Sequence, residues 1–155
     1  MPTQDTLITA ADQVNPLLTA ADVMTAAPRT CSKFSTVLEA VLIFRDADCG
    51  FVPVVDGGTP VGVLTDRDVA LALADHPDDL PETALADVMT GGAVTVRGDD
   101  KLDAVKAKFS DRGVRRLLVV NADGGLVGVI SWADLAPHVS ERGLGGLVHR
   151  VVEQP

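Results

Sequence analysis

The sequence is poor in aromatic residues and cysteine. Aromatic residues make up 3% of the 155 residues, with no tyrosine, so the core must be built from Val, Leu, Ile and Ala. The two cysteines, Cys31 and Cys49, are too few for a disulfide framework and fit the reducing cytoplasm. We expect both thiols to be buried as small hydrophobic groups. A chain of this length buries about 68–70% of its unfolded surface, so it needs neither disulfides nor metal to fold.

Basic charge and long apolar runs are also missing. There are 13 Lys and Arg against 22 Asp and Glu, a net charge of −9, which argues against nucleic acid or an anionic membrane as a partner. The sequence contains no run of about 18 apolar residues, the length that would predict a transmembrane helix. The first residues lack the basic start and apolar stretch of a signal peptide. We therefore expect a cytoplasmic protein.

Signatures of catalysis are absent as well. None of His76, His138 and His149 has a second histidine or a cysteine at metal-binding spacing. There is no Walker-type or G-x-G-x-x-G loop, and no Ser or Cys nucleophile can be paired with a histidine base. We expect a protein that is not an enzyme and that requires no metal or cofactor.

The chain does contain an internal repeat. Four blocks recur in the same order at offsets of 64 to 66 residues. They are ADVMT (21–25 and 86–90), TVLEAV and DKLDAV (36–41 and 100–105), FVPVVD and RLLVVN (51–56 and 116–121), and VGVLTDRD and VGVISWAD (61–68 and 127–134). Two copies of one structural unit explain this pattern.

Each copy predicts the order β-α-β-β-α. The first helix opens with a capping box, Thr36 with Glu39 in one copy and Asp100 with Asp103 in the other. Turn residues then separate two strands, at about 51–55 and 61–64, with counterparts at about 116–120 and 126–130. The first helices show apolar residues at helical spacing, which we assign to the core: Val37, Leu38, Val41, Leu42 and Phe44, and Leu102, Val105 and Phe109.

These elements predict an α/β (α+β) fold of two β-α-β-β-α motifs packed with pseudo-twofold symmetry. Neither half, at about 60 residues, supplies a large core alone. Residues 74–83 are rich in Pro and Asp and read as a linker. Each terminal segment is compatible with an edge-covering helix, a dimer contact or a frayed end. The predicted boundaries are 1–19 for an N-terminal extension, 20–79 for motif 1, 80–140 for motif 2 and 141–155 for a C-terminal tail.

The charged turn after each second strand has two readings. Thr65 with Asp68, and Ser131 with Asp134, form capping boxes at the start of a helix, a role sufficient in itself. Both boxes also follow the carboxyl end of a strand, where a crevice forms beside the helix. A carboxylate there can accept hydrogen bonds from ribose hydroxyls, and the helix N–H groups can meet a phosphate.

The doubled pattern resembles a tandem pair of CBS motifs, a Bateman module. The DVMT blocks, the strand GFVPVVD and the block VGVLTDRD carry the resemblance in the first copy. RRLLVVN and VGVISWAD carry it in the second. It covers about residues 20 to 137. The resemblance implies a non-catalytic module that binds AMP, ADP, ATP or S-adenosylmethionine in clefts between the motifs and pairs into a flat homodimer.

The resemblance also assigns roles to individual residues. It implies that Asp68 and Asp134 hold ribose hydroxyls and that Thr65 and Ser131 approach phosphate or ribose. Arg116 matches a basic phosphate-binding position. The remaining site residues are those flanking adenine, namely Val52, Pro53, Leu117 and Leu118, and those reaching in from the extended pieces, namely Thr30 and Thr95.

The two copies differ at the site, so we expect two unlike clefts. Trp132 and Ala133 replace Asp66 and Arg67, and Trp132 either leans over the second cleft or covers the core. Six cations lie within 101–116. A solvated helix face explains the lysines among them equally well, whereas Arg115 and Arg116 lead into a strand, where a phosphate-binding role is favoured.

Two functions follow from these observations. The first is a free-standing regulatory sensor that binds an adenine nucleotide and signals to a separate effector protein. The second is an interaction module with vestigial sites that dimerises or docks on a partner without ligand, which the atypical second copy favours. The sequence names neither the ligand nor the effector.

Overall fold

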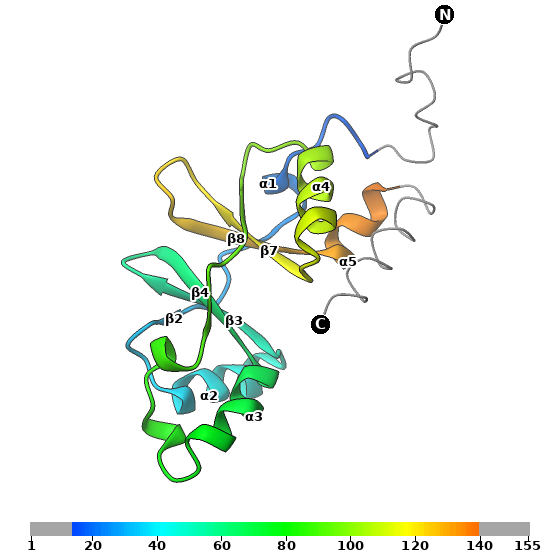
Figure 1. The fold of residues 1–155 in the computed structure, drawn as a ribbon. Helices are drawn as coiled ribbons and strands as arrows, with labels where there is room; N and C mark the ends of the chain where they lie inside the picture. Colours follow the sequence, from blue (N-terminus) through cyan, green and yellow to red (C-terminus); the bar gives the residue numbers. More distant parts are fainter. Residues whose placement is uncertain (1–13, 140–155) are drawn as a thin grey trace, which may run out of the picture. The chain divides into compact units, whose positions relative to one another are not determined.

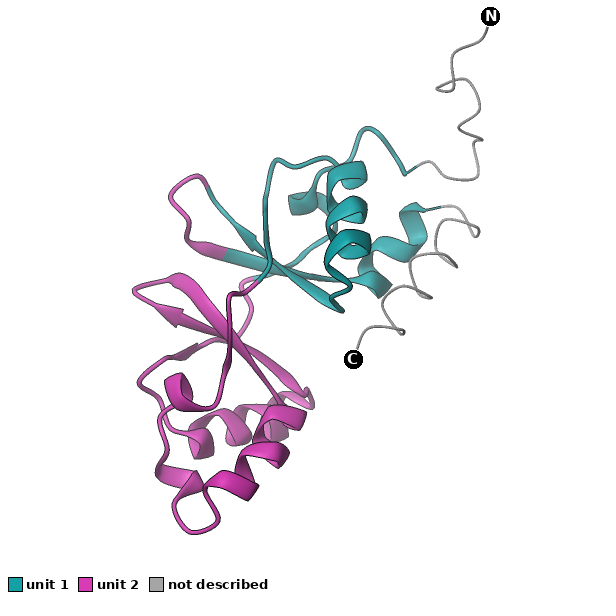
Figure 2. Ribbon diagram, in the orientation of Figure 1, with its two compact units in different colours: residues 1–26, 94–121, 127–155 teal, residues 27–93, 122–126 magenta. Residues whose placement is uncertain are grey.

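The computed structural model describes residues 14–139, which form two compact units (Figures 1 and 2). Within these residues, unit 1 comprises 14–26, 94–121 and 127–139, and unit 2 comprises 27–93 and 122–126. The predicted C-terminal tail and most of the N-terminal extension lie outside the described residues. No helix within 14–139 has the length and apolar character to cross a membrane.

Unit 2 is built mainly from the first sequence copy. Its sheet has the order β2-β3-β4-β5 and lies against α2 and α3 (Figure 1). Its elements in chain order are β2 (Cys31–Ser32), α2 (Val37–Ala47), β3 (Phe51–Asp56), β4 (Thr59–Thr65), α3 (Asp66–Asp75), the 3-10 turns η3 (Leu80–Glu82) and η4 (Leu85–Asp87), and β5 (Thr90–Gly91).

The connections in unit 2 follow from local sequence. Strand β2 pairs with β3 in parallel because α2 returns the chain to the same end of the sheet. Strands β3 and β4 form an antiparallel hairpin. Its turn places Gly57 and Gly58 at φ of 59° and 85°, a left-handed conformation that glycine adopts without steric cost.

The core of unit 2 lies between its sheet and its helices. Val52 and Val54 of β3 are fully buried there, with Val37 and Ala40 of α2. The assignment of the apolar residues of α2 to the core is confirmed for Val37 and is wrong for Leu38, Val41 and Leu42. These three side chains lie on the outer side of the helix, with exposed fractions of 50%, 36% and 37%.

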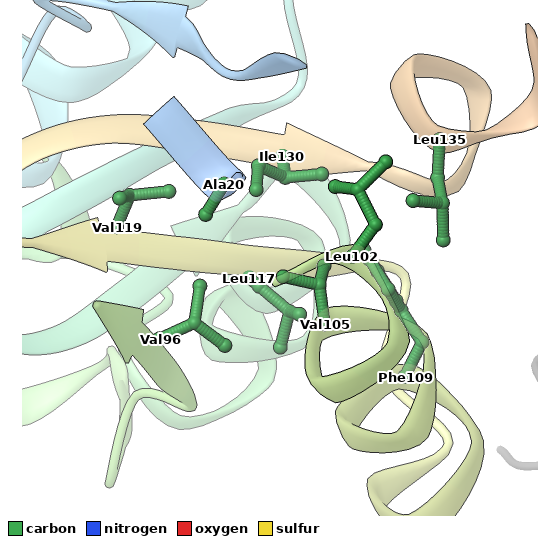
Figure 3. Close-up of a cluster of buried hydrophobic side chains, with 9 residues drawn as sticks. All are labelled: Ala20, Val96, Leu102, Val105, Phe109, Leu117, Val119, Ile130 and Leu135. Carbon is green, nitrogen blue, oxygen red and sulfur yellow. The ribbon is translucent and has the colours of Figure 1, made fainter. Parts of the chain in front are cut away.

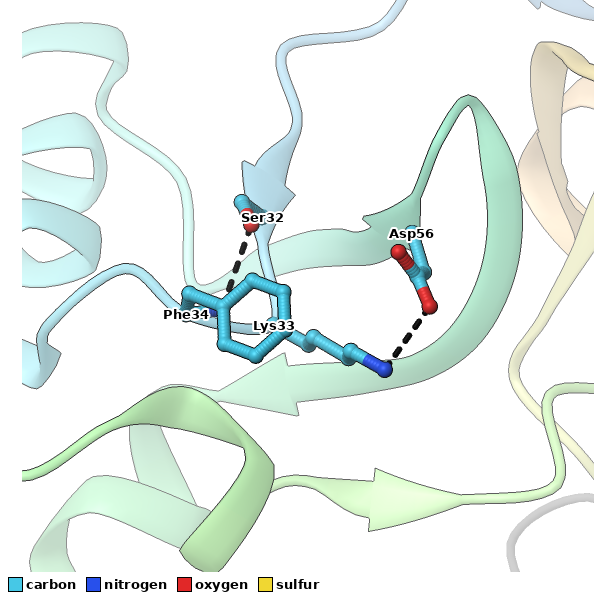
Figure 4. Close-up of polar contacts among 4 residues, drawn as sticks. All are labelled: Ser32, Lys33, Phe34 and Asp56. Atoms are coloured by element: carbon cyan, nitrogen blue, oxygen red, sulfur yellow. Dashed lines mark hydrogen bonds and ion pairs between the residues drawn. The ribbon is translucent and has the colours of Figure 1, made fainter.

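The loop between β2 and α2 is tied to the sheet by polar contacts (Figure 4). Lys33 Nζ lies 2.7 Å from Asp56 Oδ2 and 4.9 Å from the centroid of the Phe34 ring. The Phe34 N–H donates to Ser32 Oγ. Phe34 itself is 73% exposed, so its ring lies outside the core of the unit.

The predicted linker is packed rather than free. Leu80 of η3 is 7% exposed and belongs to the core of unit 2. The Thr83 carbonyl accepts the Val37 N–H at 2.9 Å, and this bond fastens the segment to the first turn of α2. Its Pro and Asp content therefore marks a 3-10 turn that docks on α2.

Unit 1 is built mainly from the second copy. Its sheet has the order β1-β8-β7-β6. Its elements are α1 (Ala20–Val23), β1 (Thr25–Ala26), β6 (Thr95–Arg97), α4 (Leu102–Arg112), β7 (Arg116–Val120), β8 (Leu126–Ser131), α5 (Trp132–Leu135) and the 3-10 turn η5 (Ala136–His138). The predicted α/β fold and the order β-α-β-β-α are thus confirmed in both copies.

The core of unit 1 brings α4 and α5 against the sheet (Figure 3). Phe109 is the largest fully buried side chain and packs with Leu117 of β7 and Ile130 of β8. Ala20 of α1 is also fully buried in this cluster, so a helix from the start of the chain completes a core made mostly from the second copy.

The two copies exchange their first strands, which the predicted element order did not include. Strand β1 lies near the start of the first copy but pairs with β8 of unit 1, Thr25 opposite Val129. Strand β5 lies near the start of the second copy but pairs with β4 of unit 2, Thr90 opposite Val63. The compact units therefore divide the chain differently from the sequence repeat.

The start of α4 corrects one prediction. Its N-cap is Lys101, which makes no side-chain cap bond, so Asp100 and Asp103 do not form a capping box. Asp100 Oδ2 accepts the Arg97 N–H instead, and Asp103 Oδ1 accepts the N–H of the next residue. The helices α2 and α4 correspond at an offset of 65, because Val37 and Leu102 are both the first, buried residues of their helices.

Candidate functional site

The first candidate group lies where β4 passes into α3. Thr65 is the N-cap, and its hydroxyl oxygen accepts the Asp68 N–H at 3.1 Å. Asp68 Oδ2 in turn accepts the Thr65 N–H at 2.9 Å. This reciprocal pair satisfies two N–H groups that the helix cannot bond internally, and its carboxylate lies at the positive end of the helix dipole. The predicted capping role is confirmed, and it uses one oxygen of Asp68.

The other oxygen of Asp68 meets a residue that the sequence analysis missed. Thr90 Oγ1, on β5, donates to Asp68 Oδ1 at 3.3 Å. The two residues are brought together because β5 pairs with β4, the strand that leads into α3. The available signal was the ADVMT block, which ends in Thr90 in one copy and in Thr25 in the other.

A hollow of about 210 Å³ lies beside this group, along α3 and η4. Three carboxylates line it, those of Asp68, Asp75 and Asp87, together with His76 and three apolar residues. The concentration of negative charge disfavours a phosphate in this hollow. A phosphorylated ligand held by Asp68 therefore has to place its phosphates elsewhere.

The second candidate group lies where β8 passes into α5. Asp134 Oδ2 accepts both the Ser131 N–H at 2.8 Å and the Ser131 hydroxyl at 3.1 Å. Among residues 14–139, Asp134 Oδ1 accepts no hydrogen bond. The helix is short, because Pro137 ends it early. Trp132 is its first residue and is 37% exposed.

The predicted adenine-flanking residues lie on both faces of the strands. Val52 and Leu117 are fully buried, with an exposed fraction of 0%, and each belongs to the core of its own unit. Pro53 and Leu118 follow them directly and, by strand alternation, point to the opposite face of each sheet. Pro53 and Leu118 are buried as well, but they belong to neither of the two core clusters.

The remaining predicted residues are also divided between the units. Thr95 of β6 pairs with Leu118 of β7 in unit 1, whereas Thr30 directly precedes β2 in unit 2 and is exposed. Arg115 and Arg116 lie at the start of β7 and are exposed.

The structure thus gathers Thr30, Val52, Pro53, Thr65 and Asp68 in unit 2. The residues gathered in unit 1 are Thr95, Arg115, Arg116, Leu117, Leu118, Ser131 and Asp134. A cleft shared by the two copies stays a prediction.

The two groups differ in charge and packing. The Gly50 carbonyl accepts the Asp66 N–H at 3.0 Å, and a Cβ at Gly50 would lie 2.6 Å from Asp66 Oδ2. The carboxylate therefore occupies the space that a side chain at this position would need. The counterparts in unit 1 are Arg115 and Trp132. Where unit 2 has the pair Gly50 and Asp66, unit 1 therefore has a cationic and an aromatic side chain.

Two shifted pKa values bear on the structure rather than on ligand binding. Hydrogen bonds from Thr19 lower the pKa of Asp22, which forms a further capping box at the start of α1. Burial raises the pKa of the Cys31 thiol. Cys31 is buried as predicted, but Cys49 is exposed, which corrects the prediction for that thiol.

A comparison with known families decides what kind of module this is. The sequence profile described as CBS domain matches residues 20–75 and 85–141, most of the chain. The chain belongs to the CBS domain family. It carries two CBS domains in tandem, as the resemblance implied.

Curated relatives support the same assignment. The CBS domain-containing protein YhcV of Bacillus subtilis is 32% identical over 115 residues, which are 74% of this chain and 81% of YhcV. Protein YlbB of the same organism is 34% identical over 118 residues, which are 74% of this chain and 78% of YlbB.

Solved structures of CBS proteins have a similar fold. The CBS domain protein TA0289 of Thermoplasma acidophilum is 24% identical with a TM-score of 0.73 over 86% of this chain and 75% of its own. CBSX2, solved in complex with AMP, is 25% identical with a TM-score of 0.66 over 77% and 94%. The CBS domain pair of protein MJ0100, solved with 5′-methylthioadenosine and S-adenosyl-L-methionine, is 25% identical with a TM-score of 0.66 over 81% and 95%.

Proposed function

We propose that this protein is a regulatory module that binds an adenosine-containing ligand and passes its bound state to an effector protein. The observation that carries the proposal is the repeated carboxylate at a helix start, Asp68 after β4 and Asp134 after β8, in a family where CBSX2 and MJ0100 have been solved with adenosyl ligands. Asp68 and Asp134 accept the ribose hydroxyls, the group common to AMP, ADP, ATP and S-adenosylmethionine.

The charges of the two groups point to unequal sites. Asp68 lies among the acidic residues of α3 and η4, which suits a ligand whose adenosine part does the binding. Asp134 belongs to the unit that carries Arg115 and Arg116, both exposed, which suits a ligand with phosphates. We assign the phosphorylated nucleotide to the Asp134 group, where occupancy by AMP, ADP or ATP would report the cellular energy state.

Calorimetric titration with AMP, ADP, ATP and S-adenosylmethionine tests the proposal. We expect binding of at least one ligand, and a loss of about tenfold or more in affinity for Asp68→Ala or Asp134→Ala, because each removes a charged hydrogen-bond acceptor. Absence of heat and of thermal shift with all four ligands would reject it.

Glu39→Ala provides the matched control for capping. Glu39 Oε2 accepts the Thr36 N–H at 2.8 Å in an equivalent capping box of α2, so its loss costs helix stability without touching either candidate group. Glu39→Ala should lower the melting temperature and leave affinity unchanged. Equal losses of affinity in all three variants would assign Asp68 and Asp134 to capping alone.

We also propose a homodimer formed through the outer faces of α2 and α3. These helices expose Leu38 and Leu42, and Leu71 and Leu73, with exposed fractions from 37% to 61%. The residues aligned with Leu38 and Val41 in unit 1 are Asp103 and Lys106, so α4 does not repeat the apolar outer face of α2. A self-complementary apolar face of this kind fits an isologous dimer.

Light scattering of wild type and Leu38→Glu tests the dimer. A charge on each copy at the centre of the interface should produce monomers, whereas Ala107→Glu, at an exposed site of α4, should leave the mass unchanged. A wild-type monomer would reject the dimer. The same apolar face also fits the second candidate function, a ligand-free interaction module, for which effector binding would be insensitive to Asp68→Ala and Asp134→Ala.

The proposal gives the protein no chemistry of its own and places it in the cytoplasm. It needs no cofactor beyond the regulatory ligand. Incubation of the purified protein with each nucleotide, followed by chromatography of the products, tests the first point, and steady turnover would overturn it.

A further inference from the structure

The hydrogen bond between Thr90 and Asp68 links a candidate ligand-binding carboxylate to a strand that ends at the boundary of unit 2. Asp68 Oδ2 accepts the Thr65 N–H at 2.9 Å, whereas Oδ1 accepts a longer bond, so Oδ1 is the oxygen that a ligand hydroxyl engages more easily. Thr90 Oγ1 lies on that oxygen at 3.3 Å. Oδ1 can accept two hydrogen bonds, and a ligand hydroxyl that takes the position of the Thr90 hydroxyl competes with Thr90 there.

The bond is a weak one. Hydroxyl-to-carboxylate hydrogen bonds have typical lengths of about 2.5–2.7 Å, well below the 3.3 Å between Thr90 and Asp68. Thr90 is exposed, so water can replace Asp68 as its partner at little cost. A ribose hydroxyl at ordinary distance therefore exchanges favourably with the Thr90 hydroxyl.

Strand β5 has few other attachments. It consists of two residues and pairs only with β4, Gly91 opposite Gly62 and Thr90 opposite Val63. Directly after it, Gly92 adopts φ of 71°, and the chain enters unit 1 at Val94. A change in how β5 is held is thus a change at the connection between the units.

Unit 1 provides the internal comparison. Thr25 of β1 lies opposite Val129, in the register that Thr90 has with Val63. Asp134 nevertheless takes its bonds from Ser131 on Oδ2, and no threonine from β1 reaches its Oδ1. The hydrogen bond between the short strand and the helix-start carboxylate, which we call the clamp, is thus present in unit 2 and not at the equivalent position of unit 1.

We infer that Thr90 is a positioning residue that competes with ligand hydroxyls for Asp68, so that binding at Asp68 releases the edge strand β5. The inference rests on the proposed function for the ligand, a ribose-containing molecule. The clamp between Thr90 and Asp68 is independent of it. In this arrangement Thr90 lowers ligand affinity at the Asp68 group and converts binding into a change at the connection of the two units.

Hydrogen exchange of the ligand-free protein tests the clamp. In Thr90→Val, the amides of β5 and of the paired residues of β4 should exchange about twofold faster than in wild type, the lower end of the effect of one hydrogen bond, because this bond is long. Thr90→Ser keeps the hydroxyl and should exchange like wild type. Thr25→Val, the matched change in β1, should leave β5 unaffected. Unchanged exchange in Thr90→Val would overturn the inference.

Titration with the four adenosyl ligands tests the competition. Thr90→Val should bind at the Asp68 group about twofold more tightly than wild type, Thr25→Val should bind equally, and ligand should speed exchange of the β5 amides in wild type. Weaker or equal binding by Thr90→Val overturns the competition. If wild type binds none of the ligands while Thr90→Val still loosens β5, the proposed function fails and the clamp stands.

Discussion

At the scale of single residues, the structure separates two thiols that composition alone could not distinguish. Cys31 begins β2 and is 5% exposed, and burial raises the pKa of its thiol above the ordinary 9.0. Cys49 follows α2 and is exposed. Only a thiolate attacks a disulfide reagent, and only an accessible one does so quickly.

We predict two phases when the native protein reacts with a disulfide reagent such as DTNB at pH 8. One thiol, Cys49, should react within minutes, and the second only as fast as the protein opens. Cys49→Ser should remove the fast phase and Cys31→Ser the slow one. Two equally fast thiols would contradict the burial of Cys31.

The same residue has a consequence at alkaline pH. The folded state keeps Cys31 protonated to a higher pH than the unfolded state does, so its contribution to stability is fully present below about pH 9 and is lost as the pH rises further. Denaturant unfolding between pH 8 and 10.5 should show a smaller loss of stability for Cys31→Ala than for wild type. Parallel pH dependences would refute this role.

At the scale of elements, the two equivalent helices begin differently. Thr36 caps α2 in a complete box, whereas Lys101 occupies the N-cap of α4 and contributes no side-chain bond. Lys101 has the extended backbone, φ −72° and ψ 156°, that a capping residue requires. The N–H groups at the start of α4 thus lack an acceptor that α2 provides.

We predict that Lys101→Ser stabilises the protein by about 1 kcal/mol and that Thr36→Ala destabilises it by a similar amount. Urea unfolding followed by circular dichroism measures both. Lys106→Ser, in the middle of α4, is the control, and it should be neutral or slightly destabilising because serine is a poorer helix former. A loss of stability in Lys101→Ser would contradict the prediction.

Local signals account for what the sequence revealed about these elements. The repeated blocks, the glycine turn of 57–58 and the boxes at Thr65 and Ser131 each arise from contacts within a few residues, so pattern alone located them. The sequence also identified the family and proposed most of the residues that the structure places at the two helix starts. The offset of 64 misplaced the start of α4, because Leu102 aligns by composition with Leu38 but by burial with Val37.

What the sequence could not show depends on pairings between distant segments. Nothing within the ADVMT blocks marks them as strands, and two-residue strands carry no alternation. Thr90 reaches Asp68 only because β5 joins β4. The outer face of α2 is apolar like its inner face, so periodicity assigned Leu38 and Leu42 to a core from which the sheet geometry excludes them.

At the scale of the whole molecule, the exchanged strands make the second copy dependent on the first segment of the chain. The sheet of unit 2 is complete within residues 27–93. The sheet of unit 1 needs β1, and its core needs Ala20, which is fully buried among residues of the second copy. Division of the chain after residue 93 should therefore destabilise the second copy more than the first.

We predict that fragment 27–93 retains more helix and strand than fragment 94–155, measured by far-UV circular dichroism. Trp132, the only tryptophan, reports unit 1, and its fluorescence in fragment 94–155 should resemble that of the unfolded chain. Addition of a peptide of residues 1–26 should restore the native spectrum. A native spectrum without the peptide would contradict the role of β1 and α1.

A residue in the left-handed backbone conformation directly follows each of the two exchanged strands. Ala27 and Gly92 follow β1 and β5 at the same interval, with φ of 50° and 71°. An L-residue pays about 1–2 kcal/mol in this conformation. We predict that Gly92→Ala destabilises the protein by about 1 kcal/mol, whereas Ala27→Gly is neutral or mildly stabilising, both measured by urea unfolding. Gly98→Ala, at a glycine without positive φ, is the control.

The exchange of edge strands between the two copies has a consequence for how such a chain could have evolved. A polypeptide carrying one copy would end its sheet one strand short while holding an identical strand it cannot use itself. Two such polypeptides would complete each other's sheets by exchanging those strands, whereas a single polypeptide would stay incomplete. Duplication and fusion of the gene would then turn a concentration-dependent dimer into a single chain. The sequences of its two halves could afterwards diverge independently.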